Sequence, residues 1–225
     1  RSAARLAVMA NGIIDETPEI WGETVSTDST TVERDYDRFA ETGTYDETFD
    51  AWGYVGPETA AAILRNYVPR ESRILDAACG SGLTGTALAN LGYEHIVGID
   101  ISTGLLALAD RTGAYERLER VDMQALPLPF EDGEFDAVNF IGALSYFETS
   151  EILGELCRIV RTGGHVVFSQ RDDIMRDRDY DTHLHELERS GCWTRVVVTE
   201  PMPYLPHHPG YRDEIEVRYF VFEVR

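Results

Sequence analysis

The sequence contains no lysine. Its 20 basic residues are therefore all arginines, and they stand against 40 acidic residues to leave a formal net charge of −20. No Arg-rich run offsets this charge locally. Nucleic acids are polyanions and would be repelled by such a surface, so we expect no nucleic-acid partner.

Long apolar runs are also missing. None approaches the roughly 18 consecutive residues that a membrane-spanning helix requires, and residues 1–16 hold only a weak, interrupted apolar stretch where a signal peptide needs a continuous one. Cysteine is scarce: Cys79, Cys157 and Cys192 are an odd number at wide spacing, which fits neither a disulfide framework nor a zinc knuckle. We expect a cytoplasmic protein with reduced thiols and no membrane contact.

Two regions differ in composition. Residues 1–35 are polar and lack sustained periodicity, which predicts an N-terminal extension. Residues 36–225 have the length and apolar content of one domain. Within it, residues 36–68 carry seven aromatic side chains and a helical pattern after Pro57, which predicts a helical, aromatic lid.

From Arg73 onward, short apolar runs alternate with helical ones. The expected strands are RILDAA, HIVGID, RLERVDM, FDAVNFIGA and GGHVVFSQ, followed by TRVVVTEPMPY and IEVRYFVFEVR. Alternating βαβ units with near-continuous apolar strands predict a parallel sheet with helices on both faces. The last two strands predict an antiparallel edge.

The turn at residues 80–85 reads GSGLTG, formally the G-x-G-x-x-G pattern of dinucleotide-binding domains. Asp76 ends the preceding strand, close to where a pyrophosphate would have to sit. A carboxylate there repels phosphate and attracts an ammonium group. This favours the amino-acid end of a nucleoside cofactor over a dinucleotide.

Two more acids end the next strands. Asp100 lies 18 residues after Gly82, where an acid accepts hydrogen bonds from both ribose hydroxyls. Asp122 follows the third strand with Met123 beside it, so that the carboxylate can accept from an adenine amine while the thioether packs on the ring. Acids at three successive strand ends indicate a neutral or cationic nucleoside.

These motifs resemble those of class I S-adenosylmethionine-dependent methyltransferases. ILDAACGSG resembles their first motif, VGIDIS the ribose-binding strand, VDMQALPLPFEDGEFDAVNFIGALSYF the adenine loop and fourth strand, and RTGGHVVFS the fifth strand. With YDRFAETGTYDETFDAWGY and HLHELERSGCW, they resemble more narrowly the methyltransferase-like 27 family, also called the Williams–Beuren syndrome region 27 family, over about residues 36–225. The resemblance implies an α/β fold with a Rossmann-like, seven-stranded, mostly parallel sheet, helices on both faces and an antiparallel edge strand.

The resemblance also implies S-adenosylmethionine as the cofactor, S-adenosylhomocysteine as its product, and a set of contacting residues. These are Asp76, Ala78, Gly80 and Gly82 for the methionine portion, Asp100 and Ile101 for the ribose, Asp122 and Met123 for the adenine, Ile141 beneath the sulfonium, and Tyr36 and Tyr45 beside the cofactor and over the acceptor. Many relatives have glycine in place of Ala78, and we expect the extra methyl group to be tolerated with the backbone at negative φ.

Methyl transfer is an in-line displacement, in which the protein mainly positions a nucleophile and excludes water; no catalytic residue is predicted. A small-molecule acceptor is expected. His183 and His185 are a poor helical ligand pair, and no metal is expected. Two alternatives stay open: an NAD(P)-dependent oxidoreductase, which Asp76, Asp122 and the absence of lysine for a Tyr-x-x-x-Lys pair argue against, and a non-catalytic S-adenosylmethionine-binding regulator.

Overall fold

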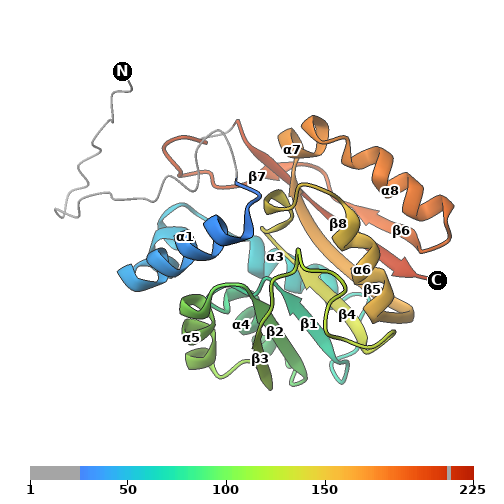
Figure 1. Ribbon diagram of the computed structural model, residues 1–225, viewed down its shortest axis with the longest axis horizontal. Coiled ribbons are helices and arrows are strands. Elements are labelled where there is room, and N and C mark those ends of the chain that lie inside the picture. The colour runs from blue at the N-terminus through green and yellow to red at the C-terminus, as the bar shows by residue number, and fades with distance from the viewer. Residues whose placement is uncertain (1–25, 212–213) are drawn as a thin grey trace.

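A single sheet runs through the middle of the protein, and helices cover both of its faces (Figure 1). The computed structural model describes residues 26–211 and 214–225. Most of the predicted N-terminal extension, residues 1–25, lies outside the described residues. None of the helices in the described part of the chain has the length and apolar character needed to cross a bilayer.

Eight strands form the sheet in the described residues. They are β1 (Ile74–Ala77), β2 (Ile96–Asp100), β3 (Arg117–Arg120), β4 (Phe135–Phe140), β5 (Val160–Arg171), β6 (Trp193–Val198), β7 (Met202–Pro203) and β8 (Glu216–Val224). Their order is β3-β2-β1-β4-β5-β8-β6, with the two-residue β7 paired to β8. The first five strands are parallel, and β8 runs antiparallel to both β5 and β6.

This arrangement confirms the predicted fold class. The strands β1 and β2 are buried along their whole length, as expected of parallel strands covered on both faces. The β6 strand forms one edge of the sheet, and the antiparallel pairing that the last two apolar runs predicted is present. The seven expected strands are the seven consecutive neighbours in the sheet order, and the short strand β7 pairs with β8 outside that order.

The helices divide between the two faces of the sheet. They are α1 (Ser29–Thr42), α2 (Tyr45–Ala51), α3 (Gly56–Leu64), α4 (Leu83–Asn90), α5 (Thr103–Thr112), α6 (Glu151–Ile159), α7 (Asp172–Asp177) and α8 (Tyr180–Arg189). Apolar side chains of α3 and α4 share one core cluster with the sheet, and those of α6 and α8 share the other. Each face of the sheet therefore has its own hydrophobic core. The carboxyl ends of the strands lie at the edge between these two cores.

The α1 helix begins at Ser29, before the boundary at residue 35 that composition predicted. Its start is capped by Asp28, whose carboxylate accepts a hydrogen bond from the backbone N–H of Thr31 at 2.8 Å. Val32 and Phe39 are seven residues apart, which places them on the same face of the helix, and both are buried. Most of the residues between them are polar, so the apolar face is hard to recognise in the sequence. The helix lies beside α5 (Figure 1).

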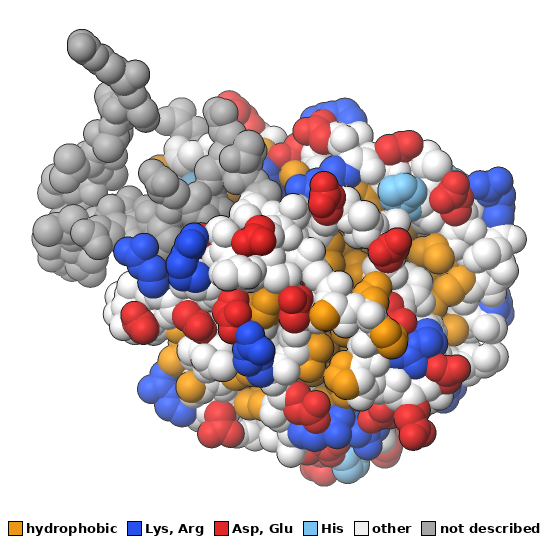
Figure 2. Space-filling model, in the orientation of Figure 1, with side chains coloured by type: hydrophobic (Ala, Val, Ile, Leu, Met, Phe, Trp, Pro, Cys, Tyr) orange, Lys and Arg blue, Asp and Glu red, His pale blue; other side chains and the backbone are white. Residues whose placement is uncertain are grey.

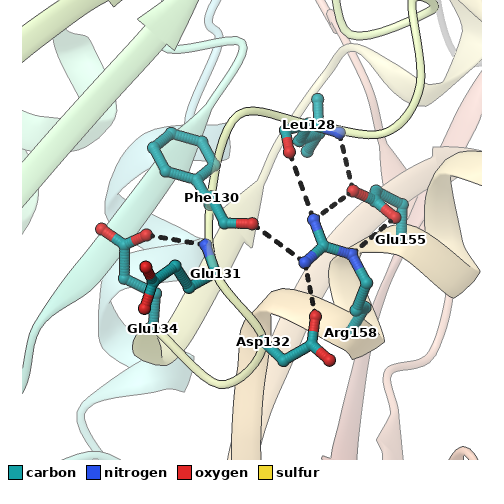
Figure 3. A network of polar contacts seen from close by, with 7 residues as sticks. All are labelled: Leu128, Phe130, Glu131, Asp132, Glu134, Glu155 and Arg158. Carbon is teal, nitrogen blue, oxygen red and sulfur yellow. Dashed lines mark hydrogen bonds and ion pairs between the residues drawn. The ribbon is translucent and has the colours of Figure 1, made fainter.

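A polar network fixes the loop between β3 and β4 against α6 (Figure 3). The Arg158 guanidinium donates to both carboxylate oxygens of Glu155, at 3.0 and 2.6 Å, and to the carbonyl oxygens of Leu128 and Phe130, at 3.2 and 2.9 Å. It also pairs with Asp132 at 2.7 Å. One arginine thus holds three points of the loop that follows Asp122.

Replacing Arg158 by Met should lower the free energy of unfolding by about 2–3 kcal/mol, because it removes charge-assisted bonds and leaves the partly buried Glu155 without its partner. Urea titration measures this. The matched control is Arg161→Met: Arg161 pairs with Asp136 at 2.6 Å, but its side chain is half-exposed, so the cost should stay below about 1 kcal/mol. Equal losses in the two variants would show that the network does not fix the loop.

Candidate active site

A cavity opens above the carboxyl ends of β1, β2, β4 and β5. It encloses about 1050 Å³ of empty space, including the solvent at its mouth. Its walls come from α1 and α2, from the turns that follow the strands, and from the segment after β7. Eight of the eleven predicted site residues line it, and they are Tyr36, Tyr45, Ala78, Asp100, Ile101, Asp122, Met123 and Ile141.

Asp100 lies at one end of this cavity, at the last position of β2. Its Oδ1 accepts from the backbone N–H of Ser102 at 2.9 Å, and its Oδ2 accepts from that of Gly80 at 2.8 Å. Burial raises the pKa of the Asp100 carboxyl, although these backbone hydrogen bonds oppose the shift. Each oxygen can accept a second hydrogen bond, so the carboxylate is oriented by the turn and still able to take two hydroxyl groups.

Asp122 and Met123 lie beside it, after β3. Asp122 Oδ1 accepts from the Ser29 hydroxyl and from the Gln124 backbone N–H, both at 3.0 Å. Its Oδ2 has no hydrogen-bond partner within residues 26–211 and 214–225. The Met123 side chain is buried and lines the same cavity. A free carboxylate oxygen next to a thioether is an arrangement that suits an amino-substituted aromatic ring.

The turn after β1 corrects one expectation. Ala78 has φ = 56°, in the left-handed region, and not the negative φ that we expected of it. The chain must reverse tightly from β1 into the glycine turn, where Gly80 and Gly82 also have positive φ, at 57° and 94°. The reversal forces Ala78 out of the negative φ that alanine prefers. In this left-handed conformation an alanine costs roughly 1 kcal/mol relative to glycine.

Ala78→Gly should therefore stabilise the protein, by up to about 1 kcal/mol, because glycine adopts positive φ without a steric penalty while its greater freedom in the unfolded chain offsets part of the gain. Thermal or urea unfolding measures the change. The matched control is Ala87→Gly, within the α4 helix, which should destabilise by about the same amount. Loss of stability in both variants would contradict the strain at Ala78.

Three predicted residues are not brought to the cavity wall. Asp76 is buried on the α3–α4 side of the sheet, where its Oδ2 accepts from the Tyr115 hydroxyl at 2.7 Å. A Cβ on Gly82 would meet the Ala109 backbone and the Tyr115 ring at 3.1 Å, so this glycine serves the packing of the turn on α5. Gly80 is also absent from the cavity lining. The atom nearest to where its Cβ would be, apart from its chain neighbours, is the Tyr45 hydroxyl at 3.6 Å.

The other end of the cavity is aromatic. Besides the predicted Tyr36 and Tyr45, its lining residues include Tyr54 and Tyr146, which lie within the motifs but were given no individual role, and Arg171, Tyr204 and Tyr211. The Tyr36 hydroxyl donates to that of Tyr146 at 2.6 Å, which joins α1 to the turn after β4. The hydroxyls of Tyr54 and Tyr204 converge over Gly142, at 2.8 and 3.7 Å from where its Cβ would be.

These tyrosines are neutral hydrogen-bonding groups. Burial raises the pKa of Tyr36, Tyr45 and Tyr54 well above the usual value, and that of Tyr146 to about 12. No histidine or cysteine lines the cavity within the described residues, and no group of three or more His, Cys, Asp or Glu side chains there is arranged to hold a metal ion. The arrangement therefore suits a reaction that depends on positioning and exclusion of water.

Comparison with known proteins agrees with this geometry. Residues 75–168 match a family model described as a methyltransferase domain. The chain is 32% identical over 169 residues to human methyltransferase-like protein 27, covering 72% of this chain and 68% of that protein. It is 38% identical over 117 residues to a demethylmenaquinone methyltransferase of Clavibacter sepedonicus, covering 50% of this chain and 47% of that protein.

Among solved structures, a TehB-like S-adenosylmethionine-dependent methyltransferase from Corynebacterium glutamicum superposes with a TM-score of 0.61 at 22% identity, covering 84% of this chain and 99% of that one. This likeness shows the shared fold. S-adenosylmethionine is therefore the cofactor and S-adenosylhomocysteine the product, and the oxidoreductase and non-catalytic alternatives fall away. The chain belongs to the class I S-adenosylmethionine-dependent methyltransferases, in the family of methyltransferase-like protein 27.

Proposed function

We propose that this enzyme methylates a small molecule, with the cofactor at the acidic end of the cavity and the acceptor at the aromatic end. S-adenosylmethionine supplies a methyl group on a sulfonium, which needs no activation by the protein. The chain's own residues bind the two molecules, align them and keep water out. The observation that carries the proposal is the pair Asp100 and Asp122, which share one end of a cavity with Met123.

The residues at this end fit the nucleoside half of the cofactor. Asp100 offers two acceptor positions for the ribose hydroxyls, and Asp122 Oδ2 offers one for the adenine amine. Ile101 and Met123 supply apolar surface for the ring, and Ile141 supplies it beneath the sulfonium. The tight turn at Ala78 and Gly80 leaves room for the methionine portion.

Asp76 takes a different place in this proposal. Its carboxylate is directed to Tyr115 and not to the cavity, so we assign it the support of the glycine turn from beneath. Tyr36 and Tyr45 come from the predicted lid at residues 36–68. They close the cavity from above, with Tyr36 joined to Tyr146.

The acceptor's class follows from the size and charge of the site. Residues of α1 and α2 form part of the cavity's walls, which supports a small acceptor over a polymer. Arginine side chains lie singly or in pairs among acidic ones on the face drawn in Figure 2, and the whole chain has a net charge of −20, which supports exclusion of nucleic acid. The three free cysteines support the predicted reducing, cytoplasmic location.

Asp100→Ala should weaken binding of S-adenosylhomocysteine by about 2–4 kcal/mol, because it removes an acceptor from two ribose hydroxyls. Isothermal titration calorimetry on the folded variant measures this. Asp110→Ala, on the exposed face of α5, is the matched control and should bind as the parent does. NAD should give no heat in any of the proteins, since no cation of residues 26–211 and 214–225 lines the nucleoside end to hold a pyrophosphate. Binding of NAD with no response to S-adenosylhomocysteine would overturn the assignment of this end.

A further inference from the structure

Among the described residues, the aromatic end of the cavity holds one cationic side chain, Arg171, at the last position of β5. The ionisable side chains of this part of the chain that line the cavity, apart from the tyrosines, are Asp100, Asp122 and Arg171. The two acids lie at the ends of β2 and β3, whereas Arg171 ends β5, on the opposite side of β1 and β4 in the sheet order. The cavity therefore has an acidic end and a cationic end.

The Arg171 guanidinium is buried and held in a fixed orientation. Its Nε and Nη2 donate to the two carboxylate oxygens of Asp173 at 3.0 and 2.6 Å, and its Nη1 donates to the Tyr211 hydroxyl at 3.2 Å. The guanidinium carbon lies 4.9 Å from the centre of the Tyr211 ring. The Arg171 side chain is 9% exposed, so these contacts set the direction of the guanidinium fork.

This arrangement leaves part of the guanidinium without a partner. Arginine carries five N–H donors, and three have partners among the described residues. One N–H on Nη1 and one on Nη2 remain. These adjacent nitrogens match the spacing of the two oxygens of a carboxylate, and unmade bonds of a buried guanidinium are costly.

We infer that the acceptor is a small aromatic carboxylic acid whose carboxylate binds the remaining N–H groups of Arg171. This rests on the proposed function, since it assigns the aromatic end of the cavity to the acceptor. The planar body of such a molecule can pack against the lining tyrosines Tyr54, Tyr146 and Tyr204, whose rings are apolar on their faces and polar at their hydroxyls. The group to be methylated then points away from Arg171, toward Ile141 and Gly142 at the end of β4.

The alternative occupant of Arg171 is the carboxylate of the cofactor's own methionine. The glycine turn that frames the methionine follows β1, and β5 lies two strands away from β1 in the sheet order, a distance of about 10 Å between strand axes. In this sheet the strand order reverses between β1 and β4, and ligands of such sheets bind on both sides of that point. Arg171 lies on the β4–β5 side, and the glycine turn lies on the β1 side. This geometry favours the acceptor, and the cofactor's carboxylate is an outcome that the experiment separates.

The test uses benzoate as the probe and benzamide as its neutral match, each titrated into the 225-residue protein saturated with S-adenosylhomocysteine. We expect benzoate to bind at least about tenfold more tightly than benzamide, and Arg171→Met to abolish the preference. Arg218→Met is the matched control: Arg218 also pairs with a carboxylate, that of Asp172 at 2.9 Å, and it does not line the cavity, so the preference should persist. Asp173→Asn keeps Arg171 and removes the competing carboxylate, so it should strengthen benzoate binding several-fold.

The outcomes are distinct. Equal binding of benzoate and benzamide by the parent protein, or an unchanged preference in folded Arg171→Met, would overturn the inference while leaving the proposed function in place. If Arg171→Met weakened S-adenosylhomocysteine by about tenfold or more, Arg171 would belong to the cofactor and the inference would fall. Absence of S-adenosylhomocysteine binding by the parent would instead remove the proposed function itself. Should Arg171→Met not fold, the response of Asp173→Asn decides: a benzoate affinity that does not rise overturns the inference.

Discussion

Raising the pH from 5 to 8 should cost the cofactor-free protein about 3 kcal/mol of its free energy of unfolding through one carboxyl group, that of Asp76. Burial raises the pKa of this group to about 7 in the folded protein, although the Tyr115 hydroxyl bond opposes the shift, while in the unfolded chain it is near 3.9. The folded state therefore binds the proton more tightly than the unfolded state. Its stabilisation is complete below about pH 4 and is lost as the pH rises through 7.

Urea unfolding of the parent and of Asp76→Asn at a series of pH values isolates this effect. Asparagine keeps an oxygen that can accept from Tyr115 but does not titrate, so the variant should lose much less stability over the same range. His165 titrates in this window with the opposite sign, because burial lowers its pKa and favours the folded state as the pH rises. The difference between the two proteins removes that contribution. Parallel pH profiles would contradict a raised pKa at Asp76.

Asp37→Ala should open the lid about a hundredfold more often than in the parent protein, because two charge-assisted hydrogen bonds are together worth about 3 kcal/mol. Asp37 Oδ1 accepts from the Ser102 hydroxyl at 2.6 Å and from the Gly104 backbone N–H at 2.9 Å. Both donors lie at the start of α5, so Asp37 helps to hold α1 on the core, together with the Ser29–Asp122 and Tyr36–Tyr146 hydrogen bonds. Hydrogen exchange of the α1 amides measures the opening.

The matched control is Glu33→Ala on the same helix. Glu33 pairs with Arg120 on the surface, where an ion pair is worth less than about 1 kcal/mol, so exchange should rise less than about fivefold. Methyl transfer should fall in Asp37→Ala and stay near the parent level in Glu33→Ala, since Tyr36 reaches the cavity only while α1 is docked. Equal exchange rates in the two variants would show that Asp37 does not hold the lid.

The meeting of Asp100, Asp122 and Met123 at one end of a cavity could be predicted because their positions follow from local rules. Asp100 and Asp122 each come directly after an apolar strand, and the carboxyl ends of parallel strands meet at one edge of the sheet. The same rule misplaced Asp76, because alternation along β1 turns its side chain onto the face where Gly98 leaves room for Tyr115. An acid at a strand end is thus insufficient to predict a ligand contact.

Tyr36 and Tyr45 were predicted to lie over the acceptor, but the contacts at the aromatic end could not be predicted, because distant parts of the chain build them. Arg171 and Tyr211 are 40 residues apart, and Tyr36 and Tyr146 are 110 apart. Only the antiparallel pairing of β5 with β8 and the docking of α1 bring these side chains together. No periodicity or spacing rule encodes such contacts, and an arginine at the end of an expected strand has no signal that separates it from a surface arginine.

The position of β8 determines when this enzyme can become active during its synthesis. The β8 strand is inserted between β5 and β6 and also pairs with β7, so in the described residues β6 and β7 have no partner strand, and β5 has only β4, until residues 216–224 are present. Strands β1 to β4, with Asp100 and Asp122, can assemble while the remainder is still being translated. A nascent chain should therefore acquire the ability to hold a nucleoside well before it acquires an acceptor pocket, and the β5 edge stays open to wrong strand pairing until residues 216–224 are synthesised.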